Sequence, residues 1–155
     1  MERGVVFSLQ DRHFALPLDA VTRVVRAVEI TPLPDAPEGV CGVIDVQGEI
    51  VPVIDLRSRF ALPRRELAID DQFLVARTAK RVLALWVDRV SGVAVWGEGD
   101  FVDAAALVPG SRRLRGVARG EGGLMLVHDL DALLSPDEAA ATAATAATAE
   151  GGAGA

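Results

Sequence analysis

The feature of this sequence that most constrains its fold is an internal repeat. A displacement of the chain by 74 residues places 42–56 on 116–130, where glycine, valine, aspartate and leucine recur at matched positions. A displacement by 69 residues places 14–21 on 83–90, where alanine, leucine, aspartate and valine recur in the same order. One loop insertion reconciles the two displacements, because they differ by only a few residues. The chain therefore consists of two related units.

Both units are predicted to be built from short strands. Short apolar runs recur along the chain, separated by turn-prone pairs such as Gln10-Asp11, Gln47-Gly48 and Gly122-Gly123. This pattern indicates a barrel or a sandwich. The run Val82–Val87 is apolar on both faces, so both faces must be covered. A second barrel packed against the first would provide that cover.

The repeat also predicts which residues form the core and which close the strands. Apolar positions that recur at matched places should be largely buried, namely Leu16, Val43, Val53, Leu85, Val117 and Val127. Acidic residues follow the strands at matched places and are interpreted as N-caps, whose carboxylates accept hydrogen bonds from free backbone N–H groups. These residues are Asp19, Asp55, Asp88 and Asp129.

Charge and composition exclude several classes of protein. The net charge is −6; residues 137–155 carry three acids and no base, and the rest of the chain has 16 basic against 19 acidic side chains. A mildly acidic body does not attract phosphate backbones, so no nucleic-acid binding is expected. Residues 137–155 are rich in alanine and of low complexity, and we expect a frayed tail there, with helix only near Asp137–Ala141. The folded domain is expected to span residues 1–136.

The chain is expected to be a soluble, cytoplasmic protein without membrane insertion. The N-terminus has no signal-peptide pattern, and no apolar run approaches the roughly 18 residues of a membrane helix. The single cysteine, Cys41, excludes an internal disulfide.

No set of residues indicates catalysis, a cofactor or a metal. His13 and His128 lie in or beside strand runs, and Cys41 adds only one further ligand without metal-binding spacing. His128 occupies the place of Ile54 in the repeat, which favours a half-buried structural role. We therefore expect a protein that is not an enzyme.

One stretch carries a family resemblance. Residues Gly42–Phe60 read GVIDVQGEIVPVIDLRSRF and resemble the signature of CheW-type chemotaxis coupling proteins, roughly G-V-x-N-L-R-G-x-I-x-P-V-x-D-L-R-x-x-F. Further elements resemble the family's V-x-E-I motif, its P-x-x-P loop, its V-D-x-V motif and its closing strand and helix. These elements are Val21–Val24, Ile30–Pro37, Leu85–Val90 and Leu124–Leu134.

The resemblance implies two intertwined five-stranded SH3-like barrels with a shared apolar core, the second barrel at roughly residues 72–125. It also implies a non-catalytic adaptor without cofactors that couples the regulatory domain of a CheA-type histidine kinase to the cytoplasmic tip of chemoreceptors in membrane-associated arrays. The family positions implicated in partner contact correspond to Val21, Arg23, Val24, Gly42, Gln47 and Gly48.

Two departures from the family pattern concern these positions. Arg23 stands where the family has Glu, and Gln47 stands where it has Arg, so the usual ion pair cannot form. We expect altered partner choice, with an acidic residue on the partner facing Arg23, unless Arg23 pairs internally with Glu49 or Asp45. Two alternatives stay open: an accessory protein that binds a dedicated kinase without receptor contact, and a small β-barrel module that binds a ligand.

Overall fold

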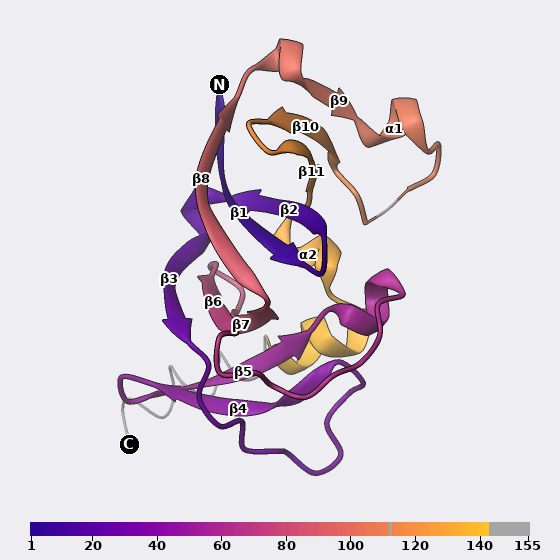
Figure 1. Ribbon diagram of the computed structural model, residues 1–155. Coiled ribbons are helices and arrows are strands. Elements are labelled where there is room, and N and C mark those ends of the chain that lie inside the picture. The colour runs from indigo at the N-terminus through magenta and orange to yellow at the C-terminus, as the bar shows by residue number, and fades with distance from the viewer. Residues whose placement is uncertain (112, 143–155) are drawn as a thin grey trace.

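The computed structural model describes residues 1–111 and 113–142, and strands dominate this part of the chain (Figure 1). The strands are β1 (Glu2–Leu9), β2 (Arg12–Pro17), β3 (Val21–Arg26), β4 (Val40–Val46), β5 (Glu49–Asp55), β6 (Gln72–Arg77), β7 (Val82–Val87), β8 (Arg89–Trp96), β9 (Phe101–Asp103), β10 (Gly116–Gly120) and β11 (Gly123–Val127). The short helices are η1 (Leu18–Ala20), η2 (Arg57–Phe60), η3 (Glu98–Asp100), α1 (Ala104–Leu107) and α2 (Leu130–Leu133), and residues 136–142 are also helical. None of these helices is long and apolar enough to cross a membrane.

The strands form two small barrels, which confirms the expected all-β fold. The six-stranded barrel has the order β8-β1-β2-β11-β10-β9, and the five-stranded barrel has the order β3-β6-β7-β5-β4. The additional strand of the first barrel is β9, a three-residue strand that pairs with β10. In the five-stranded barrel a single bridge between Thr31 and Val43 occupies the corresponding place beside β4.

The two units of the repeat exchange their first hairpins. Strands β1 and β2, from the N-terminal unit, join β8–β11, and β6 and β7, from the C-terminal unit, join β3–β5. The boundary expected near residue 72 therefore does not coincide with the division between the barrels. Residues 72–87 belong to the five-stranded barrel, and residues 2–17 complete the other.

The strand registers reproduce the repeat. In the β1–β8 ladder Val5 lies opposite Val93, and in the β3–β6 ladder Leu74 lies opposite Val24, which are the matched positions at a displacement of 69 residues. Both ladders also contain a bulge at matched positions. The sequence repeat is thus a structural repeat, down to single residues.

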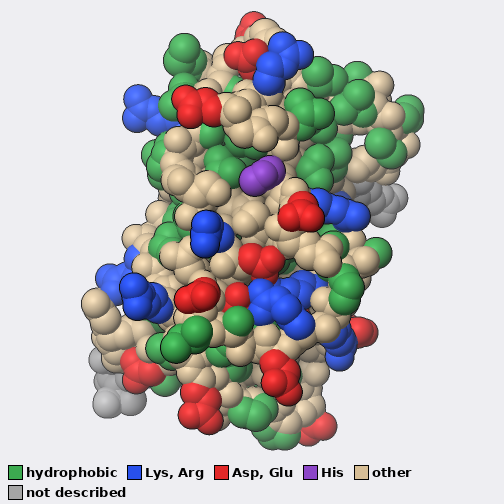
Figure 2. Space-filling model, viewed as in Figure 1, with side chains coloured by type: hydrophobic (Ala, Val, Ile, Leu, Met, Phe, Trp, Pro, Cys, Tyr) green, Lys and Arg blue, Asp and Glu red, His purple; other side chains and the backbone are tan. Residues whose placement is uncertain are grey.

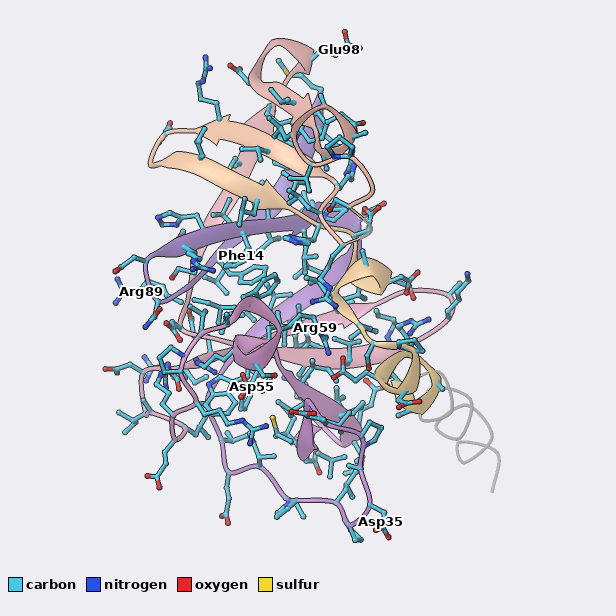
Figure 3. The ribbon with its side chains drawn as sticks, turned by 90° about the vertical axis from the view of Figure 1, so that its right-hand side faces the viewer. Phe14, Asp35, Asp55, Arg59, Arg89 and Glu98 are labelled. Atoms are coloured by element: carbon cyan, nitrogen blue, oxygen red, sulfur yellow. The ribbon has the colours of Figure 1, made fainter. Side chains whose placement is uncertain are left out.

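A large apolar cluster lies between the barrels, and a smaller one fills each barrel. The alternation of side chains along β7 shows why that strand is apolar throughout: Leu83, Leu85 and Val87 belong to the shared cluster, and the residues between them to the interior of the five-stranded barrel. Figure 3 shows Phe14, a member of the shared cluster, at the level between the barrels. The second barrel is therefore the cover that the two-faced apolar run required.

The predicted core is confirmed at most of its positions. Leu16, Val53, Leu85 and Val127 are fully buried. Val43 and Val117 are only half-buried, because they alternate along β4 and β10 with the buried residues Ile44 and Ala118 and so point to the opposite face of each strand.

The four aspartates do not occupy the predicted N-cap positions with capping bonds. The N-cap of η2 is Leu56, and Asp55, one residue before it, accepts a hydrogen bond from the backbone N–H of Arg57 (3.0 Å). Asp129 precedes α2 but its side chain accepts no capping bond, and Asp19 lies within η1. Asp88 instead accepts from the N–H of Gln10 (2.6 Å), on the hairpin of the other unit.

The helix expected near Asp137–Ala141 is present at residues 136–142, and the folded body extends past the expected boundary at residue 136. Ser135 and Glu138 form a capping box, in which the N–H of Ser135 donates to Glu138 Oε1 (3.0 Å) and the N–H of Glu138 donates to Ser135 Oγ (3.2 Å). Glu138 is fully buried and pairs with Arg59 of η2 (2.7 Å). The remainder of the Ala-rich segment, residues 143–155, lies outside the described residues.

Candidate partner-binding surface

The six residues implicated by the family resemblance lie in the five-stranded barrel, on β3 and on the β4–β5 hairpin. Strand β3 is an edge strand, and in Figure 1 it lies on the same side of the barrel as the turn between β4 and β5. Arg23, Val24, Gln47 and Gly48 are exposed, with 38% of the Val24 surface accessible. These four residues define the surface that we call the β3–turn surface.

The turn that carries Gln47 has a defined geometry. Gln47 and Gly48 both have positive φ angles, 50° and 91°, which is the backbone of a two-residue type I′ hairpin turn. Asp45 Oδ1 accepts a hydrogen bond from the N–H of Gly48 (2.7 Å) and so stabilises the turn. The sequence predicted this hairpin, and the Asp that replaces the family's Asn serves its geometry.

The charge of Arg23 is not balanced by a neighbour. Within residues 1–111 and 113–142 no ion pair or hydrogen bond joins the Arg23 side chain to Gln47, Asp45 or Glu49. Glu49 instead pairs with Arg77, at the end of β6. The internal pairing that would have made Arg23 purely structural is therefore not formed.

The other two residues have packing roles. Gly42 is buried with φ 150°, and a Cβ atom there would lie 2.1 Å from the carbonyl oxygen of Thr31, which bonds to Val43 on the same bridge. Only glycine permits this close approach. Val21 is half-buried and packs against the shared apolar cluster. Substitution of either residue would disturb the fold as well as any partner contact.

An ionic network that sequence reasoning missed lies beside the shared core. Asp71 is buried and accepts hydrogen bonds from Arg65 (2.7 Å), the indole N–H of Trp86 (2.9 Å) and the N–H of Ala68 (2.8 Å). Burial alone would raise the pKa of Asp71, but these donors hold it below its usual range. The segment between η2 and β6 is thereby fastened over Trp86.

The same network joins the two units through Asp88. Its carboxylate accepts from Arg57 (2.5 Å) and Arg65 (2.6 Å) as well as from the Gln10 N–H. Burial opposes ionisation of Asp88, yet the hydrogen bonds from Gln10 and Arg57 keep its pKa below the usual value. The only signal in the sequence was an aspartate at a matched position of the repeat, which predicted a cap and not an interunit contact.

The side chains with reactive or ligating groups have structural surroundings. Burial, with Asp55 nearby, raises the pKa of the Cys41 thiol to about 11, so the thiolate is scarce at neutral pH. His128 is more deeply buried than predicted and lies against Phe14 and Phe60. In the part of the chain that the structure describes, no three His, Cys, Asp or Glu side chains are grouped so as to hold a metal ion.

The face of the molecule shown in Figure 2 is not uniform. Charged side chains of both signs gather over the lower lobe, which Figure 1 identifies as the five-stranded barrel. Apolar side chains are also exposed on this barrel, including Val24 and Ile50, the latter with 53% of its surface accessible. An exposed edge strand with apolar and charged side chains together is typical of a protein–protein contact.

Comparisons with known proteins agree with this architecture. The CheW-like domain family matches residues 3–138. The chemotaxis protein CheW of Rhizobium meliloti is 28% identical over 136 residues, which cover 86% of this chain and 88% of that protein. The chemotaxis protein CheW of Klebsiella aerogenes is 30% identical over 139 residues, covering 88% of this chain and 83% of that protein.

A solved structure is similar over nearly its whole length. The scaffolding protein TtCheW from Thermoanaerobacter tengcongensis superimposes with a TM-score of 0.75 at 28% identity, covering 88% of this chain and 96% of that one. Sequence and structure lead to the same assignment: the chain belongs to the family of CheW-like domains.

Proposed function

We propose that this protein is a non-catalytic adaptor that couples a CheA-type histidine kinase to chemoreceptors. It would bind the regulatory domain of the kinase and the cytoplasmic tip of the receptor, and act in the cytoplasm at membrane-associated receptor arrays. The proposal rests on membership of the CheW-like family together with the β3–turn surface.

The observation that supports the proposal most is that the β3–turn surface is exposed and carries a positive charge that is unpaired within the described part of the chain. Arg23 and Val24 project from an edge strand, and the Arg23 charge has no counter-charge among the described residues. An uncompensated cation beside an exposed valine gains both burial and a charge partner when another protein docks there. The bond from the Gln10 N–H to Asp88 supports this function, because it ties the β1–β2 hairpin of the six-stranded barrel to the ionic network of the other barrel.

A binding experiment with two purified probes tests the proposal. The full chain is titrated with the regulatory domain of a CheA-type kinase and, separately, with a receptor fragment that contains the cytoplasmic tip. We expect both to bind, and Val24→Glu to weaken at least one affinity about tenfold because it places a charge in the contact. Val24 serves this test better than Val21, whose substitution would also disturb the shared core.

The matched control is Val102→Glu, the same change at a valine of similar exposure on β9 of the other barrel. Equal losses in both variants would contradict the role of the β3–turn surface. Binding of the kinase alone would identify an accessory protein without receptor contact. Binding of neither probe would refute the adaptor function.

A further inference from the structure

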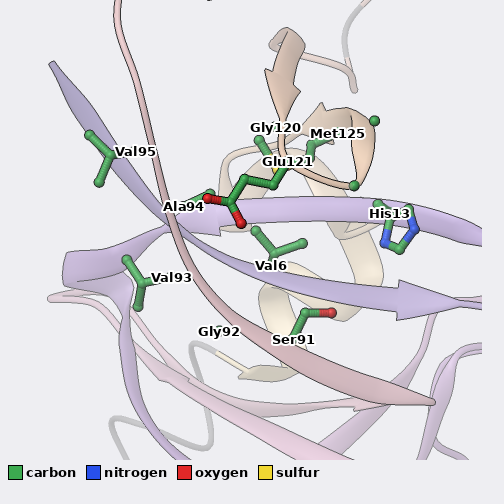
Figure 4. A pocket seen from close by; sticks show the side chains of 12 residues that line it. Val6, His13, Ser91, Gly92, Val93, Ala94, Val95, Gly120, Glu121 and Met125 are labelled. Atoms are coloured by element: carbon green, nitrogen blue, oxygen red, sulfur yellow. The ribbon is translucent and has the colours of Figure 1, made fainter.

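A cavity of about 480 Å³ opens in the six-stranded barrel, between β8 and the β10–β11 turn (Figure 4). Residues 91–95 of β8 form one wall and residues 120–123 the other, and Val6, His13 and Met125 complete the lining. We call this cavity the β8 trench. Residues 91–95 are consecutive, and their side chains point alternately to the two faces of β8. Because all five line the cavity, the cavity runs along the strand.

The β8 trench is the repeat equivalent of the β3–turn surface. Its lining positions correspond one by one to residues 22–26 and 46–49 and to three further residues of the five-stranded barrel, at displacements of 69 and 74 residues. Gly92 occupies the place of Arg23, and Glu121 the place of Gln47. The two barrels thus present the same architecture with different side chains.

Missing side chains open the trench. The five-stranded barrel has Arg23, Val46 and Glu49 at the positions where the trench has glycines, namely Gly92, Gly120 and Gly123. A Cβ atom added at Gly122 or Gly123 would meet nothing within 4 Å. A turn with glycine at 120, 122 and 123 permits the backbone of another segment to approach closely.

The edge of β8 is also unprotected. Like β3, it is the last strand of its sheet, so half of its backbone N–H and C=O groups point away from the neighbouring strand. Strand β3 carries Arg23 and Arg26 along its edge, whereas residues 91–95 carry no charge. Between Ser91 and Val95 the described residues provide no hydrogen bond to these outward groups beyond the ladder with β1.

The trench contains a single carboxylate. Figure 4 shows the Glu121 side chain extending from the turn across the opening, near Ala94 and above Val6. Glu121 forms no ion pair with any other residue of the described chain. Apart from His13, the remaining side chains of the lining are uncharged. A guest that fits this chemistry is apolar with one positive charge.

We propose that the β8 trench binds an extended segment of a partner protein, which adds as a strand to β8. Apolar side chains of the guest pack against Val6 and Met125, and a lysine or arginine of the guest pairs with Glu121. The mode is strand addition, in which main-chain hydrogen bonds give affinity and alternate side chains give specificity. This site goes beyond the coupling function and shares no residue with the β3–turn surface.

The test uses the full chain and a synthetic peptide, acetyl-TVTVRVT-amide, followed by backbone amide NMR. We expect saturable shifts at residues 91–95 and 120–123, and slower hydrogen exchange of the β8 amides that point outward. A peptide with Glu in place of Arg should bind about tenfold more weakly, because it meets Glu121 with a like charge. A peptide N-methylated at alternate residues should not bind, because it cannot complete the ladder.

Two pairs of variants complete the test. Glu121→Gln should weaken the arginine peptide about tenfold, whereas Glu29→Gln, the same change at an exposed site on the other barrel, should not. Val95→Arg should abolish binding by charging the β8 edge, whereas Val102→Arg on the opposite edge of the sheet should leave it intact.

Three results would overturn the proposal: no shifts at β8, equal effects in the members of either pair, or a wild-type chain that self-associates in sedimentation and is made monomeric by Val95→Arg. In the last case the trench would take a second copy of the chain and not a partner segment. A failure of kinase or receptor binding would leave these measurements unaffected, so the two proposals fail separately.

Discussion

His128 shows how one residue can make the stability of this fold depend on pH. Its ring is buried between Phe14 and Phe60, and Nδ1 lies 3.2 Å from the carbonyl oxygen of Leu126. Burial lowers the pKa of His128; the Leu126 carbonyl and Asp129 oppose this shift and Arg113 adds to it. The folded state therefore favours the neutral ring.

The sign of the effect follows from linkage. In the unfolded chain His128 takes up a proton near pH 6.5, whereas in the folded chain it does so only at lower pH. The stabilising contribution of the neutral ring is complete above about pH 6.5 and is lost as the pH falls below that value. We expect urea midpoints of the wild-type chain to fall between about pH 6.5 and 5.

A leucine substitution checks this assignment. His128→Leu should remove most of the pH dependence in that range, because it leaves no group to protonate at the site. The control is His13→Gln, which removes a histidine that is only half-buried and should keep the wild-type slope. A slope that persists in His128→Leu would assign the effect to other groups.

At the scale of elements, the C-terminal segment is the part of the fold whose packing the amino-acid composition did not predict. Alanine-rich low complexity suggested a frayed tail, but Ser135-Pro136-Asp137-Glu138 is a capping box with proline at the first helical position, a start signal that the sequence contained. Glu138 then reaches Arg59 and contacts Gly39. Figure 3 shows Arg59 between η2 and this segment.

The buried pair predicts a large effect of one substitution. Glu138 is fully buried and the Arg59 side chain nearly so, so Glu138→Ala leaves a buried guanidinium without its carboxylate. We expect a loss of about 3–5 kcal/mol in the free energy of unfolding, measured in urea. Asp137→Ala, the same truncation at an exposed neighbour, should change it by less than about 0.5 kcal/mol. Similar values for both variants would show that the segment is not docked in solution.

The exchange of hairpins between the units could have been predicted from connection lengths. Strand β3 lies beside β6 and runs parallel to β7. In the other barrel, β8 likewise lies beside β1 and runs parallel to β2. To pair with β6 of its own unit in the same way, β8 would have to run parallel to β7. However, only one residue, Asp88, connects β7 to β8. Such a crossover needs about a dozen residues. The short connections therefore force each hairpin onto the other unit.

Other features depended on contacts that no local pattern encodes. The sequence predicted the burial of Leu16 and Leu85 and the hairpin turn at Gln47. These features depend on the alternation of side chains along a strand and on turn residues, which are visible within a few residues of sequence. The role of Asp88 was not predictable, since its donors lie on η2, on the 61–71 segment and on the opposite hairpin. The trench became visible only once β8 and the β10–β11 turn were placed in one barrel.

At the scale of the whole molecule, the exchange makes the two barrels one cooperative unit. Leu16 and Leu85 occupy matched positions of the repeat and meet in the shared cluster, each fully buried. Leu16→Ala and Leu85→Ala should each cost about 2–5 kcal/mol, and the wild-type chain should unfold in a single transition followed by circular dichroism. Leu124→Ala, at an exposed leucine, is the control. Two separate transitions would mean that the barrels unfold independently.

Partner choice is also a property of the whole molecule. We expect it to be altered by Arg23 and Gln47, which differ from the residues of the family pattern. The family pattern that this sequence resembles has Glu and Arg at these positions, whereas this chain has a cation and a neutral amide. We expect the partner of this chain to present a carboxylate to Arg23. The double variant Arg23→Glu with Gln47→Arg restores the common charges, and both side chains are exposed, so the melting temperature should not change.

The swap should weaken binding of the chain's own kinase or receptor about tenfold or more and strengthen binding of a kinase that serves a coupler with the common pair. Both affinities are measured by calorimetry at two salt concentrations, because a charge contact at an exposed edge weakens as salt rises. Arg119→Glu, a charge reversal on the other barrel, is the matched control. If the swapped chain keeps its full affinity for its own partner and gains none for the other kinase, Arg23 and Gln47 are neutral substitutions. Specificity must then reside in the apolar part of the β3–turn surface, where Val24→Glu would still act.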